Sequence, residues 1–193
     1  MRVLIITEDF TFDQHILRPL AQAMFRHLQK PRAKVDICYQ PRLGGVDRAT
    51  DWQEIKLILD RYGMIDLFLL CVDRDGNESR RQVLDNLQER ANHFLGGNRI
   101  FLAENAWQEV EVWALAGHEL PGDWNWQEIR EDDHPKERYF LPWAEQRGLA
   151  DDLEKTYRVL GQEAAGRYGR IRQLCPELAQ LESRINAWLV QNP

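Results

Sequence analysis

Residues 67–75, LFLLCVDRD, decide the expected fold, because an unbroken apolar run ends abruptly in Asp73 and Asp75. Such a run is typical of a strand that is buried on both faces, as in a parallel sheet. Residues 2–7, RVLIIT, form a second run of this kind. We predict that the longer strand covers residues 65–72, and that residues 34–39 and 99–103 form two further short strands.

Helical spacing of apolar residues separates these strands. The sequence predicts helices from Asp13 to Leu28, through residues 51–59 and through residues 83–91. Alternation of this kind indicates an α/β fold, with a mostly parallel, Rossmann-like four-stranded sheet flanked by helices.

The second half of the chain has a different pattern. Trp107, Val110, Trp113 and Ala114 are spaced to share one helical face, and an acidic, tryptophan-rich loop follows over residues 118–134. The chain from residue 135 to residue 189 is expected to be entirely helical. We therefore expect an α/β core over residues 1–117, with the acidic loop and an all-helical C-terminal extension over residues 118–193 packed on it as one domain.

Composition narrows the class of protein. The 193 residues are 44% hydrophobic and 29% charged, which is typical of a globular chain, and the net charge of −6 argues against a generally basic nucleic-acid coat. Three cysteines without a CxxC pair argue against a disulfide framework or a zinc site. The apolar runs are too short for a signal peptide or a membrane span, so we expect a cytoplasmic protein with no membrane partner.

Acidic side chains follow three of the predicted strands. Glu8 and Asp9 follow the first strand, Asp73 and Asp75 the third, and Glu104 the fourth. Ligands of open parallel sheets bind at the carboxyl ends of the strands. In extended backbone, Asp73 and Asp75 would also point to the same side. Carboxylates without histidine or cysteine suit a hard divalent cation, so we expect Mg²⁺ or Mn²⁺ here.

A glutamate after the first strand, followed by an apolar strand that ends in Asp-x-Asp, resembles the Toprim domain of topoisomerases, bacterial primases and several nucleases. Residues 108–117, QEVEVWALAG, resemble the Glu-x-Trp signature of one Toprim-like group, the domain of unknown function 4276 family. Residues 134–137, HPKE, and residues 175–177, CPE, resemble two later motifs of that group. The likeness covers roughly residues 2 to 180.

This resemblance implies a Toprim-type fold and a Mg²⁺-dependent nuclease that acts on DNA or RNA, in a family linked to defence against mobile elements. Glu8 matches the general acid/base or metal ligand of active members, and Asp73 and Asp75 match the metal-binding pair. Glu111 matches the glutamate before the tryptophan and would add a ligand or orient a water.

The first loop departs from the family pattern. Asp9 stands where the family has glycine, and Phe12 stands where it has a second acid, with Asp13 one residue further on. The departure implies a differently shaped loop and puts a second metal site in doubt.

The chemistry of phosphodiester cleavage also needs cations for the substrate. Metal ions held by carboxylates neutralise the charge that develops on the phosphoryl oxygens, and a glutamate can move the proton. Arg74, Arg80 and Arg81 are expected to bind the polyanion, and Lys136 to support the transition state.

Three other interpretations remain open at this stage. A haloacid-dehalogenase-type phosphatase also uses Asp-x-Asp, but its motif normally opens the fold. A phosphoacceptor receiver domain would fit Glu8 and Asp9, but not the second acid Asp75. The more serious alternative is an inactive Toprim-like sensor or adaptor that acts with a partner ATPase, and an exposed Trp124-Asn125-Trp126 loop would give it a partner-binding anchor.

Overall fold

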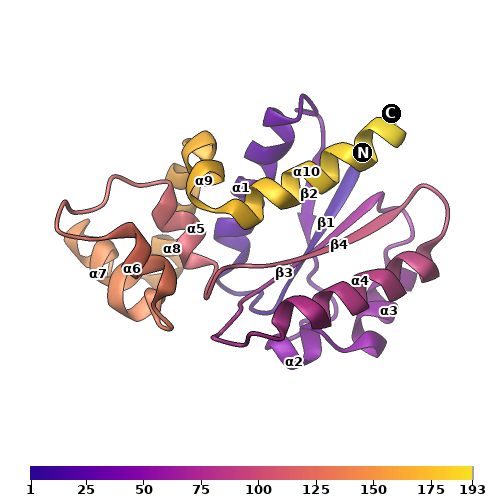
Figure 1. Ribbon diagram of the computed structural model, residues 1–193, viewed down its shortest axis with the longest axis horizontal. Helices are drawn as coiled ribbons and strands as arrows, with labels where there is room; N and C mark the ends of the chain where they lie inside the picture. Colours follow the sequence, from indigo (N-terminus) through magenta and orange to yellow (C-terminus); the bar gives the residue numbers. More distant parts are fainter. Residues whose placement is uncertain (193) are drawn as a thin grey trace.

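A computed structural model describes residues 1–192 and places four parallel strands at the centre of the molecule, in the order β2-β1-β3-β4 (Figure 1). The strands are β1 (Arg2–Thr7), β2 (Lys34–Ile37), β3 (Leu67–Val72) and β4 (Ile100–Asn105). The sheet is entirely parallel and has helices on both faces, so the predicted α/β fold class is confirmed. β4 ends at Asn105, two residues beyond the predicted end of this strand.

Eleven helical segments are described over residues 1–192: α1 (Gln14–His27), α2 (Val46–Ala49), α3 (Trp52–Arg61), α4 (Arg80–Leu95), α5 (Glu111–Ala116), α6 (Trp126–Glu131), the π-helix η1 (Lys136–Phe140), α7 (Leu141–Gln146), α8 (Leu153–Ala165), α9 (Tyr168–Leu174) and α10 (Pro176–Gln191). None of them has the length and apolar character needed to cross a membrane.

Alternate residues of the strands enter two separate hydrophobic clusters, one on each face of the sheet. Leu4 of β1 and Phe68 of β3 point to the face covered by α3 and α4. Ile5 and Leu69, the next residues along the same strands, point to the face covered by α1, α5 and the C-terminal helices. Figure 1 shows α10 and α4 on opposite sides of the sheet. Burial on both faces explains why β1 and β3 are continuous apolar runs.

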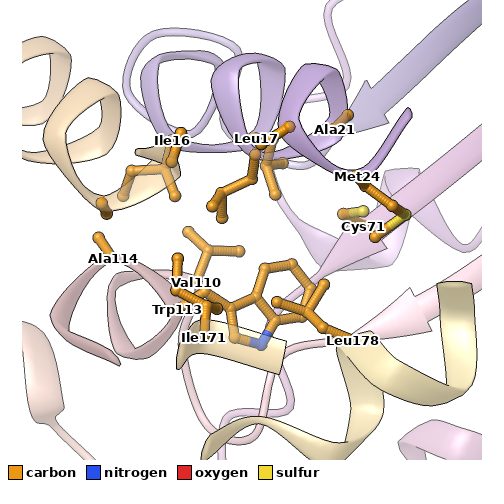
Figure 2. Close-up of a cluster of buried hydrophobic side chains, with 14 of the residues drawn as sticks. Ile16, Leu17, Ala21, Met24, Cys71, Val110, Trp113, Ala114, Ile171 and Leu178 are labelled. Atoms are coloured by element: carbon orange, nitrogen blue, oxygen red, sulfur yellow. The ribbon is translucent and has the colours of Figure 1, made fainter. Parts of the chain in front are cut away.

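Trp113 of α5 joins the C-terminal helices to the α/β part of the chain. Its side chain is fully buried, and Figure 2 shows it beneath α1 with Leu178 of α10 and Ile171 of α9 nearby. The indole Nε1 donates a hydrogen bond to Glu177 Oε1 at 2.8 Å, which satisfies its polar atom inside the core. The start of α10 is therefore fixed against α5.

The helical extension packs closely on α1. A Cβ atom at Gly161 of α8 would overlap the carbonyl oxygen of His15, so glycine is what permits the two helices to cross at this distance. Residues of α8, α9 and α10 share one hydrophobic cluster with α1 and β3.

The predicted position of Trp107 was wrong. Trp107 does not share the helical face of Val110 and Trp113, because Gln108 has a φ of +76° and α5 begins only at Glu111. Trp107 is 38% exposed as a result.

The expected loop over residues 118–134 contains a helix, α6, whose first turn is capped by the side chain of Asn125. Trp124 and Trp126 are half-buried against the core, and Trp124 packs edge-on against Tyr139 at 5.2 Å between ring centroids. The adaptor interpretation would use an exposed Trp124-Asn125-Trp126 loop as an anchor, but both tryptophans pack against the core.

Candidate functional site

The carboxyl ends of β1 and β3 bring Glu8 and Asp73 together. The two strands are adjacent and parallel, and Thr7 pairs with Cys71 in the sheet register. Each strand ends within one residue of that pair, so the acids that follow emerge at the same edge of the sheet. This placement agrees with the sequence prediction that Glu8 and Asp73 lie together at the carboxyl ends of the strands.

Asp13 and Glu111 lie close to Glu8 and Asp73. We call these four residues and Asp75 the acidic cluster. Asp13 precedes α1, and Glu111 is the first residue of α5. Both side chains are buried, with 5% and 3% of their surfaces exposed. The cluster therefore extends from the core at Asp13 and Glu111 to the surface at Asp75.

Burial and mutual repulsion raise the pKa values across the acidic cluster. Burial and the charge of Asp75 raise the pKa of Glu8 to about 7. Burial, followed by the charges of Glu8 and Glu111, raises the pKa of Asp73 well above its usual range. The pKa of Asp13 is raised by burial and by Glu111. Carboxyl groups that oppose one another's ionisation in this way have too little positive charge nearby.

Single hydrogen bonds fix three of these carboxyl groups. Asp73 Oδ1 accepts a bond from the backbone N–H of Val110 at 2.8 Å, and Asp13 Oδ2 accepts one from Asp9 at 3.2 Å. Glu111 accepts the hydroxyl of buried Tyr157. That bond lowers the pKa of Glu111, but burial is the larger effect and the net shift is upward. Glu8 Oε2 is buried and has no hydrogen-bond partner among residues 1–192.

The loop that carries Asp75 is bent rather than extended. Asp75 has a φ of +50°, so the expectation that Asp73 and Asp75 lie side by side in extended backbone was wrong. The loop is held by Gln108, whose carbonyl oxygen accepts bonds from the backbone N–H groups of Arg74 and Asp75 at 2.7 and 3.3 Å. Its side-chain oxygen also accepts from Gly76 at 2.9 Å. Asp75 remains part of the cluster, because its charge acts on Glu8.

Two of the four predicted cations lie beside the acidic cluster. Lys136 Nζ is 3.7 Å from Glu111 Oε1, and its charge lowers the pKa of that carboxyl. The first turn of η1 fixes its position, because the backbone N–H of Lys136 donates to Glu109 Oε2 at 2.8 Å. Arg80, at the start of α4, is 8% exposed and lowers the pKa values of Glu8 and Asp75. Its Nε has no hydrogen-bond partner in the described part of the chain.

The other two predicted cations contact different groups. The Arg74 guanidinium lies over the ring of Trp107, 4.2 Å from its centroid. Arg81 pairs with Asp85 and with Glu104, at 2.7 and 2.8 Å. The structure therefore places Arg80 and Lys136 at the acids, and Arg74 and Arg81 on the side of the loop that faces α10.

Glu104 does not join the acidic cluster. The sequence placed it after the fourth strand, but β4 continues to Asn105 and Glu104 lies inside it. Its carboxylate accepts hydrogen bonds from Arg81 and from Arg184 of α10. Glu104 thus belongs to a structural ion-pair network.

Sequence reasoning missed the contributions of two residues. The sequence showed Asp13 only as an acid one residue beyond the family position, at the start of a predicted helix. Its side chain makes no capping bond to α1 and instead turns to Asp9 and the acidic cluster. Tyr157, 46 residues away from Glu111, had no sequence signal.

The donor set suits a hard divalent cation only in part. Its atoms are all carboxylate oxygens, and Glu8 Oε2 is buried without a partner, which favours such an ion. Within residues 1–192, however, no three His, Cys, Asp or Glu side chains form a ready-made metal centre. Binding a cation would therefore require carboxyl groups of the cluster to turn away from their present positions.

Comparison of the chain with protein-family models, with curated proteins and with solved structures finds no match.

Proposed function

We propose that the acidic cluster catalyses metal-dependent cleavage of phosphodiester bonds in nucleic acid. The observation that carries this proposal is the meeting of Glu8, Asp13, Asp73 and Glu111 at the ends of β1 and β3. Burial raises all four pKa values, and repulsion within the cluster adds to the shift at Glu8, Asp13 and Asp73. Such a group of carboxyls weakens the fold unless a cation or protons neutralise it. Acidic clusters that lower the stability of the fold and lie at the carboxyl ends of strands are typical of functional sites.

Glu8, Asp73 and Asp75 would hold the Mg²⁺ or Mn²⁺ ion, and Glu111 would support them. The bound ion would neutralise charge that develops on the phosphoryl oxygens. Without metal the pKa of Glu8 is raised to about 7, so a Glu8 that leaves the ion to Asp73 and Asp75 would exchange a proton near neutral pH, as a general acid or base requires. A Glu8 that ligates the ion would instead be held ionised.

The cations beside the cluster have separate roles in this proposal. Arg80 is 8% exposed and its Nε is buried without a partner, so its charge would favour binding of a phosphate at the cluster, and direct donation from Nε would need the side chain to move. Lys136 lies within 3.7 Å of Glu111 and favours its ionised form.

A cleavage assay tests the proposal. Labelled single-stranded and duplex DNA and RNA are incubated with Mn²⁺ and with wild type, Asp73→Asn or Glu89→Gln, the last changing an exposed acid of α4. We expect metal-dependent cleavage of at least one substrate, a loss of at least about 100-fold in Asp73→Asn, and no loss in Glu89→Gln. Equal cleavage by wild type and Asp73→Asn would contradict the proposal.

A second candidate function is a catalytically inactive sensor or adaptor that works with a partner protein such as an ATPase. It is favoured by the lack of a ready-made three-ligand metal centre in residues 1–192, and by the internal hydrogen bonds of Asp73 and Glu111. This candidate predicts that Mn²⁺ neither binds to the cluster nor supports cleavage of any substrate in the assay. The protein would then act by binding a partner protein and not through a reaction at the carboxyl groups.

A further inference from the structure

A pocket of about 320 Å³ lies on the other side of the loop that carries Asp75. It is enclosed by the start of α4, the segment that follows β4, and the start of α10. Arg74, Trp107, Arg130 and Gln180 are among its lining residues. Its volume is at the lower end of the range for small-ligand sites, which suits one compact ring system.

Trp107 gives the pocket an aromatic surface. Its ring is 38% exposed and lies next to two guanidinium groups, with Arg74 at 4.2 Å and Arg130 at 5.5 Å from the ring centroid. Gln108, the next residue, is hydrogen-bonded to the Asp75 loop, so the indole is fixed close to that loop. The Arg74 guanidinium lies over this ring, so a planar base that stacks there would take the place of the guanidinium.

The charges that line the pocket balance. Three arginines and three glutamates line it, and two arginines have carboxylate partners there: Arg130 pairs with Glu177 at 3.0 Å, and Arg81 pairs with Glu104 at 2.8 Å. In the described part of the chain, Arg74 forms no ion pair, and its guanidinium contacts Trp107 instead.

Three side-chain amides also line the pocket, from Asn77, Asn105 and Gln180. Amides supply both donors and acceptors, which is how proteins bind the edges of nucleobases. A neutral lining with an aromatic surface and amides suits an uncharged planar ring with a hydrogen-bonding edge better than it suits a phosphate.

The pocket and the acidic cluster share one loop. Arg74 lies in the chain between Asp73 and Asp75, and its side chain contacts Trp107 in the pocket. A nucleic-acid strand that crosses this loop can therefore place a phosphate at the acids and a neighbouring base against Trp107.

We propose that this pocket binds an unpaired nucleobase, stacked on Trp107, and so selects single-stranded nucleic acid as the substrate of the acidic cluster. This inference rests on the proposed function, since it assigns the substrate class of the same site. A base inside a duplex is stacked between its neighbours and would have to leave the helix to reach the indole. Arg74, which has no carboxylate partner in the described chain, would contact the backbone beside that base.

Fluorescence anisotropy without divalent metal tests this assignment separately from cleavage. The probes are a labelled single strand of about 12 nucleotides, as DNA and as RNA, the matching duplexes, and adenosine monophosphate as competitor. The proteins are wild type, Trp107→Ala and Trp52→Ala. Trp52 is the matched control, because it also lies under an arginine, Arg90 at 4.4 Å, but packs on Phe94 near the opposite end of α4 from the pocket.

We expect wild type to bind a single strand more tightly than its duplex, and more tightly than the mononucleotide. Trp107→Ala should weaken that binding roughly tenfold and Trp52→Ala should leave it unchanged. Melting curves of both variants confirm that they are folded. Equal binding of the single strand by wild type and Trp107→Ala, a preference for duplex, or equal affinity for adenosine monophosphate would each overturn the assignment. If metal-dependent cleavage persists in any of these cases, the proposed function stands and only the pocket assignment is lost.

Discussion

Glu104 of β4 and Glu8 after β1 are largely buried glutamates near the same edge of the sheet, but their surroundings differ. Glu104 accepts hydrogen bonds from Arg81 and Arg184, so its charge is matched by two cations. Glu8 has Asp73, Asp75 and Asp13 around it, and one of its oxygens is buried without a partner. The charges of Arg184 and Arg81 oppose the effect of burial on the pKa of Glu104, whereas the charge of Asp75 adds to the effect of burial on Glu8. Burying Glu8 among acids therefore costs stability, which is typical of a binding or catalytic site.

The largest expected difference between these two regions is in catalysis. Glu8→Gln should lower metal-dependent cleavage by at least about 100-fold, because it removes either the proton-exchanging group or a cation ligand. The control is Glu89→Gln on the exposed face of α4, which should retain wild-type activity. Steady-state cleavage of the best substrate measures both. Wild-type rates in Glu8→Gln would remove Glu8 from the mechanism and leave it a buried acid without a role.

The next effect is on stability, where the two glutamates should respond in opposite directions. Glu104→Ala leaves Arg81 and Arg184 without their shared partner and should lower the free energy of unfolding by about 2 kcal/mol. That corresponds to a fall in Tm of roughly 4–8 °C for a chain of this size. Glu8→Gln, in the presence of a chelator at about pH 8, should instead raise Tm, because it removes a repelled charge. Thermal melts measure both values of Tm. A lower Tm in both variants would contradict the proposed difference between the two glutamates.

A smaller effect should appear in the pH dependence of stability without metal. The pKa of Glu8 is raised to about 7, so its contribution to stability is fully present below about pH 4.5 and is lost as pH rises through 7. Tm should therefore fall between about pH 5 and pH 8, and Glu8→Gln should flatten part of that fall. The raised pKa values of the other buried or half-buried carboxyls act in the same direction, namely those of Asp13, Asp73, Asp75, Glu104, Glu109 and Glu111. A Tm that rises over this range, in a buffer series with chelator, would contradict the assigned charges.

The smallest effect is expected at the surface end of the Glu104 network. Asp85 pairs with Arg81 one helical turn away at 2.7 Å, but both side chains are exposed to solvent. Asp85→Asn should change the free energy of unfolding by no more than about 0.5 kcal/mol, because exposed ion pairs contribute little. Denaturant titrations of Asp85→Asn and Glu104→Ala compare the two losses in the free energy of unfolding and show whether the buried pair contributes more than the exposed one. Equal losses in both variants would mean that the network acts as one unit.

The strands of the fold could be predicted because burial on both faces leaves an unmistakable apolar run at residues 2–7 and 67–72. The end of β4 could not, since Glu104 and Asn105 are polar residues that normally mark a loop. Glu104 pairs with Cys71 of β3, and its carboxylate accepts hydrogen bonds from Arg81 and from Arg184, which lies 80 residues later. Contacts at that sequence separation leave no local pattern.

The candidate site was predictable to a similar extent. Strand ends gave Glu8, Asp73 and Asp75, which the structure places together with Glu111. The hydrogen bond from Asp9 to Asp13 is local, but Glu111, whose charge acts on Asp13, lies far along the chain, so the sequence did not show Asp13 as part of the site. The exposure of Trp107 follows from the positive φ of Gln108, which is unusual for a residue other than glycine and has no sequence signal.

Calorimetric titration with Mn²⁺ tests the central claim most directly, because it asks whether the unpaired carboxyls form a cation site at all. Wild type is compared with Asp73→Asn/Asp75→Asn and with Glu89→Gln, at a pH of about 8, where Glu8 is ionised. The account predicts metal-dependent heat in wild type and Glu89→Gln, and none in the double variant. Equal heats in all three proteins, or no heat in wild type at saturating Mn²⁺, would contradict it.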